Sequence, residues 1–344
     1  MAITIKDIAR KAKVSTTAVS LAINGAKGVS EKTRQRILRL ARELNYQPNL
    51  TARSLISKRS HTIGYIVTNI TDPFYSEVAL GMEEEANKLG YKVILTNTSG
   101  RLENEAAAIA TLQARGVDGI IFSTVTVDDP NLNDLIERKF PFVVINRVPM
   151  NHPAVDRIDS VIIDSYSGGY KAVEHLYRLG HDHLAIVAGS MQTSTARERT
   201  RGGRQALADH GLKFNPRYFF EGEYDFKKAC AAAKSILKLK PRPTAVFAHD
   251  DNMAFGVREA VLSEGLRIPE DLALVGFDDI NFADLKGIEL TTVSQKKYEM
   301  GIVSTQVLVN KIEKKAVNMI SKVVLEAELV IRRSCGFHRT GYVR

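Results

Sequence analysis

The chain has 344 residues, 44% of them hydrophobic and 25% charged, a composition typical of a globular protein with two or three domains rather than a disordered one. No run of about eighteen apolar residues occurs and the first residues are charged, so the sequence predicts neither a membrane span nor an export signal, and a cytoplasmic location is expected. Residues 1–60 hold 13 of the Lys and Arg against three acids, whereas the rest of the chain holds 35 bases and 36 acids. A small region with this imbalance favours a surface that binds a polyanion.

Three short helices are predicted at the start of the chain. Thr4 and Asp7 form a capping-box pattern ahead of the first helix, Ser15 can cap a second helix over residues 16–24, and Ser30 can cap a third. The outer face of the second helix is small and uncharged, with basic residues around it that include an outward-pointing Arg34. This pattern predicts a helix-turn-helix domain whose second helix reads base edges in the major groove, through Thr16, Thr17, Ser20, Leu21 and Asn24. A three-helix module without a ligand would leave the positive charge unexplained.

Residues 48–60 connect this domain to the rest of the chain, either as a linker that only looks helical or as a helix that folds when held against a partner. Pro48 ends the third helix, and Asn49 can cap the segment LTARSLIS, a helix of about two turns that is too short to be stable alone. Leu50 and Leu55 would be exposed there, and apolar side chains of this kind can insert into a minor-groove step of DNA.

The remainder of the chain alternates strand and helix patterns in two series. The first series has apolar runs at residues 63–67, 92–96, 119–123 and 142–146, and the second at 161–164, 184–188, 245–249 and 272–277. Alternation at this spacing predicts parallel sheets covered by helices, and two series predict two similar α/β lobes.

Polar and aromatic residues follow the carboxyl ends of these strands, where ligands bind to open parallel sheets. They are Asp72 to Tyr75, Asn146, Arg147, Asp164, Asp250, Asp251, Asp278 and Asp279. Carboxylates, arginine and aromatic rings suit a small polyhydroxy or heterocyclic ligand. Helix capping is the alternative role for the aspartates, and it is most expected for Asp251.

Other functions find less support in the sequence. Phosphate-cradling motifs are absent, the two cysteines Cys230 and Cys335 fit no metal spacing, and the cluster His181-Asp182-His183 lies in a turn away from the predicted ligand site. We therefore expect no enzyme, no metal and no cofactor. A transport binding protein would share the two lobes, but it would need an export signal and would have no use for a basic helix-turn-helix.

The sequence resembles the LacI/GalR family of bacterial transcription regulators along nearly its whole length. Matching segments include TIKDIARKAKVSTTAVSLAIN, TARSL, TDPFYSEVALG, RTRGGRQAL, AVFAHDDNMAFG, LALVGFDDI and LTTVSQ. The resemblance implies DNA contacts from Thr4, Ser15, Thr16, Thr17, Ser20, Leu21, Asn24, Arg34, Asn49, Ala52 and Leu55. It implies effector contacts from Phe74, Arg199, Tyr224, Asp250 and Asp278, with Arg147 and Gln295 as secondary candidates beside Asp72.

The resemblance also implies an architecture like a periplasmic sugar-binding protein with three crossovers between lobes. We expect a DNA-binding domain over 1–47, the hinge over 48–60 and an effector-binding core over 61–344. Its N-lobe would span about 61–160 plus 293–322, and its C-lobe about 161–292 plus 323–340, completed by the last strand, VVLEAELVIRR.

The expected function is a cytoplasmic homodimeric regulator, a repressor rather than an activator, that binds a pseudo-palindromic operator in double-stranded DNA. The effector would be a sugar, with a sugar phosphate, a purine or a phosphorylated carrier protein as alternatives. The chain has no leucine heptad after Ile331, so a dimer is expected rather than a tetramer.

The chain departs from the family pattern at several positions. Leu21 stands where the family commonly has arginine, which predicts a different half-site, because leucine can touch a thymine methyl but cannot pair with guanine. Lys13 stands where glycine is common, Leu50 replaces an alanine, and Ile288-Glu289 replaces a Pro-Pro pair.

Overall fold

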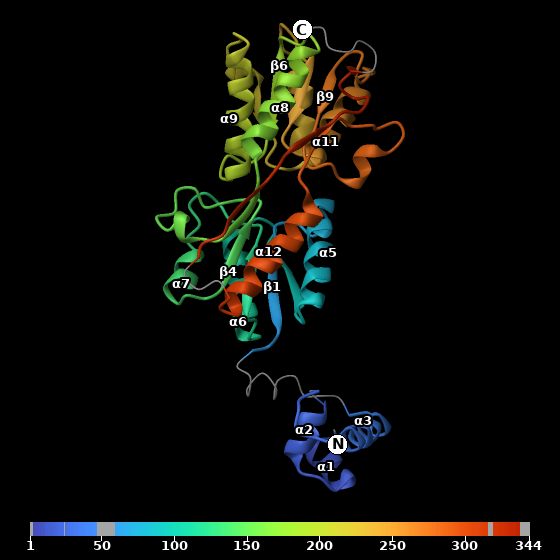
Figure 1. The fold of residues 1–344 in the computed structure, drawn as a ribbon. Coiled ribbons are helices and arrows are strands. Elements are labelled where there is room, and N and C mark those ends of the chain that lie inside the picture. Colours follow the sequence, from blue (N-terminus) through green and yellow to red (C-terminus); the bar gives the residue numbers. More distant parts are fainter. Residues whose placement is uncertain (1–2, 24, 47–58, 316–318, 338–344) are drawn as a thin grey trace. The chain divides into compact units, whose positions relative to one another are not determined.

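The computed structural model describes residues 3–23, 25–46, 59–315 and 319–337. The chain forms two compact units, Met1–Ser60 and His61–Arg344 (Figure 1). Asn24 and the predicted hinge residues Asn49, Leu50, Ala52 and Leu55 lie outside the described residues. None of the helices in the described ranges is long and apolar enough to span a membrane.

The described residues of the first unit contain three helices, α1 (Ile5–Ala12), α2 (Thr16–Ile23) and α3 (Glu31–Glu43). They enclose a small core of Ile8, Ala9, Ala12, Val19, Ala22 and Ile37. The predicted capping box is confirmed: the Thr4 N–H donates to Asp7 Oδ2 over 3.0 Å. Ser15 Oγ accepts the Ala18 N–H at 3.1 Å, and Ser30 Oγ accepts the Thr33 N–H at 3.4 Å, so both other predicted caps are present.

The turn between α1 and α2 depends on a left-handed residue. Lys13 ends α1 with φ 51° and ψ 48°, and its N–H bonds to the carbonyls of Ala9 and Arg10. The family's usual glycine would adopt this conformation without steric cost, whereas a residue with Cβ is disfavoured there.

The second unit contains two parallel sheets. The N-lobe sheet has the order β11-β5-β4-β3-β1-β2 and the C-lobe sheet the order β7-β6-β8-β9. The N-lobe strands are β1 (Thr62–Val67), β2 (Lys92–Asn97), β3 (Gly119–Phe122), β4 (Phe142–Ile145), β5 (Ser160–Ile163) and β11 (Lys322–Leu325). The C-lobe strands are β6 (Leu184–Ala188), β7 (Phe219–Glu221), β8 (Ala245–Ala248) and β9 (Ala273–Val275). A separate antiparallel pair joins β10 (Thr292–Ser294) to β12 (Glu328–Val330).

Two strand placements expected from the sequence are wrong. The sequence places the run 161–164 in the second series, but β5 pairs with β4 and β11 in the N-lobe sheet. The segment VVLEAELVIRR is not one strand of the C-lobe: β11 completes the N-lobe sheet and β12 pairs with β10. An apolar run predicts that a strand exists but not which sheet it joins, since that choice depends on the connections between lobes.

Helices cover both sheets. In the N-lobe they are α5 (Pro73–Lys88), α6 (Leu102–Ala114), α7 (Leu132–Glu137) and α12 (Lys297–Ile312), and in the C-lobe α8 (Ser165–Arg178), α9 (Ser194–Asp209), α10 (Phe226–Ile236) and α11 (Asp251–Ser263). Short 3₁₀ turns occur at Val155–Arg157, Pro216–Tyr218 and Asn281–Asp284. The chain passes between lobes after β5, after β10 and between β11 and β12, so α12 packs against α5 (Figure 1).

Candidate nucleic-acid interface and inter-lobe site

The outer face of α2 presents short side chains, as its sequence predicts. Thr16 and Thr17 are exposed, and Ser20 and Leu21 are half-buried. Val19 and Ala22 face the opposite way, into the core formed with α1 and α3. A helix whose outer side chains are short can approach base edges closely.

Arg34 does not point outward, which corrects the expectation from the sequence. Its Nη2 donates to the Ala26 carbonyl over 2.6 Å and its Nη1 to the Ala22 carbonyl over 3.3 Å. The side chain is 17% exposed and lies 3.6 Å from Glu31. The reason is that the Ala22 carbonyl in the last turn of α2 and the Ala26 carbonyl in the turn that follows lie beyond the regular bonding of the helix, so the guanidinium of α3 donates to them. Its positive charge is also favourable at the negative end of α2.

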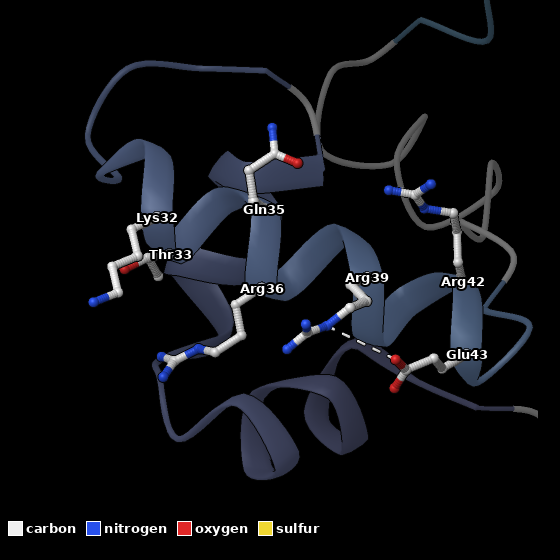
Figure 2. Close-up of a pocket in the computed structure, with 7 residues that line it drawn as sticks. All are labelled: Lys32, Thr33, Gln35, Arg36, Arg39, Arg42 and Glu43. Atoms are coloured by element: carbon white, nitrogen blue, oxygen red, sulfur yellow. Dashed lines mark ion pairs between the residues drawn. The ribbon is translucent and has the colours of Figure 1, made fainter.

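The remaining bases of α3 form a positive surface. Lys32, Arg36, Arg39 and Arg42 border a hollow of about 660 Å³ that is also lined by Thr33, Gln35 and Glu43 (Figure 2). Among these bases only Arg39 forms an ion pair within the described part of the domain, at 3.8 Å from Glu43. Such a surface is suited to neutralise phosphates.

The inter-lobe site begins with two aspartates that cap helices. Asp72 Oδ1 accepts the Phe74 N–H at 2.9 Å at the start of α5, and Asp250 Oδ1 accepts the Met253 N–H at 2.7 Å at the start of α11. The capping role expected of Asp251 therefore belongs to Asp250. Asp251 instead accepts bonds from the Ile280 N–H at 2.9 Å and the Thr292 hydroxyl at 2.5 Å.

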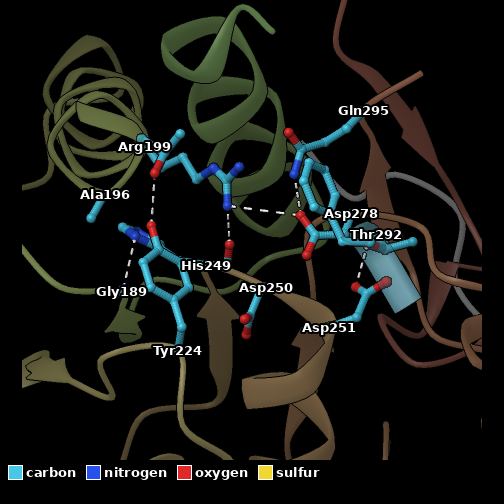
Figure 3. Close-up of polar contacts among 12 residues, drawn as sticks. Gly189, Ala196, Arg199, Tyr224, His249, Asp250, Asp251, Asp278, Thr292 and Gln295 are labelled. Atoms are coloured by element: carbon cyan, nitrogen blue, oxygen red, sulfur yellow. Dashed lines mark hydrogen bonds and ion pairs between the residues drawn. The ribbon is translucent and has the colours of Figure 1, made fainter. Parts of the chain in front are cut away.

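Arg199 occupies the centre of the C-lobe side of the site (Figure 3). Its side chain is 2% exposed, its guanidinium donates to the His249 carbonyl, and it lies 3.9 Å from Asp278. The guanidinium also stacks 3.6 Å from the centroid of Phe277. Asp278 accepts a hydrogen bond from Gln295 Nε2, so arginine, aspartate and glutamine form one buried network.

Arg147 brings the N-lobe into contact with the C-lobe. Its guanidinium lies 5.2 Å from the ring centroid of Tyr224, and the hydroxyl of Tyr224 is 2.8 Å from that of Thr195. Phe74 is buried and meets Tyr75 edge-on with centroids 5.1 Å apart. The aromatic and cationic candidates from both lobes thus lie around one region.

Lys297 joins the lobes behind this region. Its side chain is 3% exposed, and its ammonium donates to the carbonyls of Asp278 and Asp279 over 2.6 and 2.7 Å. The same ammonium lies 3.4 Å from Glu77 on α5. Asp278 and Asp279 both have positive φ, 120° and 55°, so this cation holds a strained turn that presents the Asp278 carboxyl to Arg199.

Several buried polar atoms at the site have no hydrogen-bond partner among the described residues. They are Asn146 Oδ1, Arg147 Nε, Arg199 Nε, His249 Nε2 and Gln295 Oε1. Buried polar atoms are rarely left unpaired because each costs about 1–3 kcal/mol. Donors and acceptors gathered in this way fit a polar ligand.

The carboxyl groups of the site hold protons more tightly than usual. Burial, with the nearby charge of Asp72, raises the pKa of Asp250 to about 8. Burial also raises the pKa of Asp72, and it raises the pKa of Asp278 well above the ordinary value although Arg199 opposes this. The charges from the two lobes therefore act on each other, as expected of groups a short distance apart in a low-dielectric region.

Comparison with known proteins identifies both units. Residues 4–49 match the model of bacterial regulatory proteins of the lacI family, and residues 60–331 match that of periplasmic binding proteins and the sugar binding domain of the LacI family. The chain belongs to the LacI family. As a LacI-family protein it is a DNA-binding transcriptional repressor under small-molecule control.

Curated relatives of this LacI-family chain are repressors. The transcriptional repressor PurR of Photobacterium profundum is 36% identical over 334 residues, which cover 96% of this chain and 98% of the relative. The ribose operon repressor of Haemophilus influenzae is 35% identical over 333 residues, with the same two coverages of 96% and 98%.

Solved structures agree with these relatives. A lac repressor dimer bound to operator and the anti-inducer ONPF has 28% identity and a TM-score of 0.85, and the match covers 97% of this chain and 99% of that one. A CelR–cellobiose complex has 29% identity and a TM-score of 0.73, with coverages of 96% and 99%.

The structure brings seven of the eight effector candidates of this LacI-family chain to the region between the lobes, and the eighth, Phe74, is buried at the start of α5 against Tyr75. Arg199, Asp278 and Gln295 are in contact, Arg147 faces Tyr224, and Asp72 acts electrostatically on Asp250. Sequence reasoning missed His249, Thr195 and Lys297. His249 follows directly after β8, so the rule of strand ends points to it, whereas no sequence signal marks Lys297. The ligand roles of all these residues remain predictions.

Proposed function

We propose that the chain represses transcription in the cytoplasm as a homodimer on a pseudo-palindromic operator, and that a neutral polyhydroxylated molecule, a sugar foremost, binds between its lobes and changes its affinity for DNA. The buried network of Arg199, Asp278 and Gln295 is the observation that carries the effector part of this proposal. Binding of the effector and binding of the operator are coupled because the protein has two conformations that differ in affinity for DNA. The effector acts as inducer or corepressor according to the conformation it binds more tightly.

The charge and the contacts of the site favour an unphosphorylated effector. The carboxyls of Asp250 and Asp278 are buried and that of Asp72 is half-buried, and the raised pKa values of Asp250 and Asp278 leave them able to donate hydrogen bonds to hydroxyl groups. Arg199 already donates to the His249 carbonyl and stacks on Phe277, so a phosphate would depend chiefly on Arg147. The cellobiose named in the CelR structure supports a sugar, and the PurR relatives keep a purine as the second candidate.

The test of the effector is thermal unfolding of the full-length protein with a panel of sugars, sugar phosphates, nucleosides and purines. A ligand that binds only the folded state at about a hundredfold its dissociation constant adds roughly 2.7 kcal/mol, a clear shift in Tm. We expect the shift from an unphosphorylated sugar. A shift from sugar phosphates alone would contradict the charge argument, and no shift across the panel would favour a phosphorylated carrier protein as the regulator.

Exposed apolar side chains support the homodimer. Ile70 and Leu80 on the N-lobe are 55% and 51% exposed, and Phe282 and Leu285 on the C-lobe are 52% and 51% exposed. Isologous contact between two copies would remove them from water. Sedimentation equilibrium at micromolar concentration should show a dimer, and a monomer that binds operator with unchanged affinity on dilution would contradict it.

Leu21 is proposed to set the half-site sequence. Substitution Leu21→Arg should move the base preference at one position of each half-site toward guanine, since arginine can bond guanine O6 and N7 together. Operators selected from random DNA for wild type and L21R measure this. The control is Leu38→Arg, the same change at a half-buried leucine of α3, which should leave base preference unchanged. Identical selected sites for wild type and L21R would refute the assignment.

A further inference from the structure

A second hollow lies in the N-lobe, away from the inter-lobe site. It has a volume of about 560 Å³, and Phe142, the first residue of β4, forms part of its wall. Arg147 of the inter-lobe site follows the other end of the same strand. The four residues of β4 span roughly 13 Å, so the two sites lie at opposite edges of the sheet.

One wall of this hollow is apolar and partly exposed. Met319 is 71% exposed and Ile320 is 41% exposed, and Met319 is the most exposed large apolar side chain in the described part of the chain. Leu135 of α7 and Phe142 also line the hollow and belong to the buried core, and the Phe142 ring packs edge-on against Phe122 with centroids 5.9 Å apart. A fixed aromatic ring and two apolar side chains that are exposed among the described residues therefore line the same hollow.

The rim of the hollow carries basic side chains and no acidic ones. Lys139, Arg157, Lys311 and Lys314 line it, and no acidic side chain does. Lys311 is paired with the buried Asp159. Across the described ranges no ion pair involves Lys139, Arg157 or Lys314. Residues 61–344 carry almost equal numbers of bases and acids, so three unpaired cations around one hollow are a local concentration rather than a general property of the surface.

We propose that this hollow is a second ligand site that binds a small amphiphilic anion, with a carboxylate or sulfonate head at Lys139, Arg157 and Lys314 and an aromatic or alkyl body against Phe142 and Met319. Apolar walls with a few charged groups at the mouth are the usual composition of a small-molecule site, and the volume lies within the usual range of about 300–1,000 Å³. Phosphates of DNA would use the cations but leave the apolar wall uncovered. A protein partner would need an interface of about 800 Å² on each side, far beyond this hollow.

The test uses anilinonaphthalene sulfonate, an anion with aromatic rings, as a fluorescent probe of the full-length protein, with dodecanoate as competitor. We expect saturable binding that dodecanoate displaces. The double variant Lys139→Glu, Lys314→Glu should weaken the affinity for the probe at least tenfold. The matched control is Lys213→Glu, Lys238→Glu, which reverses two exposed lysines of the C-lobe and should change the affinity less than twofold.

A second pair of variants separates this site from the inter-lobe site and guards against misfolding. Met319→Ser removes apolar surface without touching a charge and should weaken probe binding several-fold, whereas Arg199→Ala should leave it unchanged. Far-UV circular dichroism and Tm verify that each variant is folded. Probe affinity that survives both the double reversal and M319S overturns the proposal, as does loss of binding in R199A alone. If the double lysine variant instead lowers operator affinity, and the slope of log affinity against log salt falls by about two, the surface binds DNA phosphates.

Discussion

At the scale of single residues, Lys13 occupies a backbone conformation that glycine adopts more easily. With φ 51° and ψ 48° it is left-handed at the end of α1. Substitution Lys13→Gly should stabilise the DNA-binding domain by about 0.5–1 kcal/mol, since relief of the strain exceeds the entropy that glycine adds to the unfolded chain. Hydrogen exchange of the buried Ile8 amide in the full-length protein should slow by about two- to fivefold.

The control for this substitution is Lys11→Gly, two residues earlier and inside α1. Glycine in a helix interior costs about 1 kcal/mol, so exchange of the same amide should become faster. Faster exchange in K13G as well would show that the lysine side chain stabilises the domain by more than its left-handed backbone conformation costs.

Arg34 illustrates a side chain with two possible roles. In the structure its guanidinium bonds to the carbonyls of Ala22 and Ala26 and so fixes the end of α2. Substitution Arg34→Gln should lower operator affinity through loss of this support, while the slope of log affinity against log salt should stay within error of wild type. A phosphate contact, by contrast, would reduce that slope by about one.

The matched variant is Arg36→Gln, an exposed arginine on the basic surface of α3. It should reduce the salt slope if this surface contacts phosphates. Equal reduction of the slope in R34Q and R36Q would mean that Arg34 turns outward to DNA in the complex.

Local hydrogen-bonding roles could be read from the sequence where they depend only on neighbours along the chain. Thr4, Asp7, Ser15 and Ser30 cap helices as predicted, because a cap needs only a residue type and its distance from the helix start. Arg34 could not be placed in this way, since its partners are twelve and eight residues away and the turn after α2 decides whether it can reach them.

At the scale of elements, α5 and α12 pack with their backbones almost in contact. A Cβ added at Gly301 would lie 2.2 Å from the Val78 carbonyl oxygen, and one at Gly81 would lie 2.2 Å from that of Tyr298. Both obstacles are backbone atoms of another helix, so the helices must separate to accept the extra carbon. Gly301→Ala should therefore lower the free energy of unfolding of the effector-binding unit by about 1–3 kcal/mol.

Chemical denaturation followed at the transition of this unit measures the loss. The control is Asn310→Ala, an exposed position on the same helix, which should change stability by less than about 0.5 kcal/mol. Equal stability of G301A and wild type would mean that α12 shifts at no cost and that the close packing has no energetic role.

The number and type of the strands were largely predictable, whereas their pairing was not. All eight apolar runs predicted in the two series form strands, because buried parallel strands need continuous apolar segments. The sheet that each run joins depends on where the chain crosses between lobes. β5 precedes its crossing and β11 precedes another, so both belong to the N-lobe sheet although neither run differs in composition from those of the C-lobe.

At the scale of the whole effector-binding unit, the carboxyls between the lobes link stability to pH. The pKa of Asp250 is about 8 in the folded protein, against 3.8 for the ordinary side chain, because burial and Asp72 disfavour its charge. A raised pKa means that the folded state holds the proton more tightly than the unfolded state. The resulting stabilisation is complete below about pH 4 and is lost as the pH rises through 8.

The substitution Asp250→Asn tests this in the effector-free protein. Asparagine can cap α11 as aspartate does, but it stays neutral at every pH. Between pH 7 and 8.5 the wild-type unit should lose about 1 kcal/mol of unfolding free energy on account of Asp250, and D250N should lose correspondingly less. The histidines are the same in both proteins, so their contribution to the pH dependence cancels when D250N is compared with wild type.

Asp225→Asn is the control, because Asp225 caps α10 with the same geometry, its Oδ1 accepting the Lys228 N–H at 2.8 Å, but is exposed to solvent. Its substitution should leave the pH dependence as in wild type, which separates burial between the lobes from capping as the cause. A decrease in D250N as steep as in wild type would assign the pH dependence to the other buried carboxyls, among which Glu105 and Asp251 each have a pKa raised by burial to about 7. A polar effector that contacts Asp250 in either protonation state should change its pKa, so its affinity should vary over the same pH range in wild type and vary less in D250N.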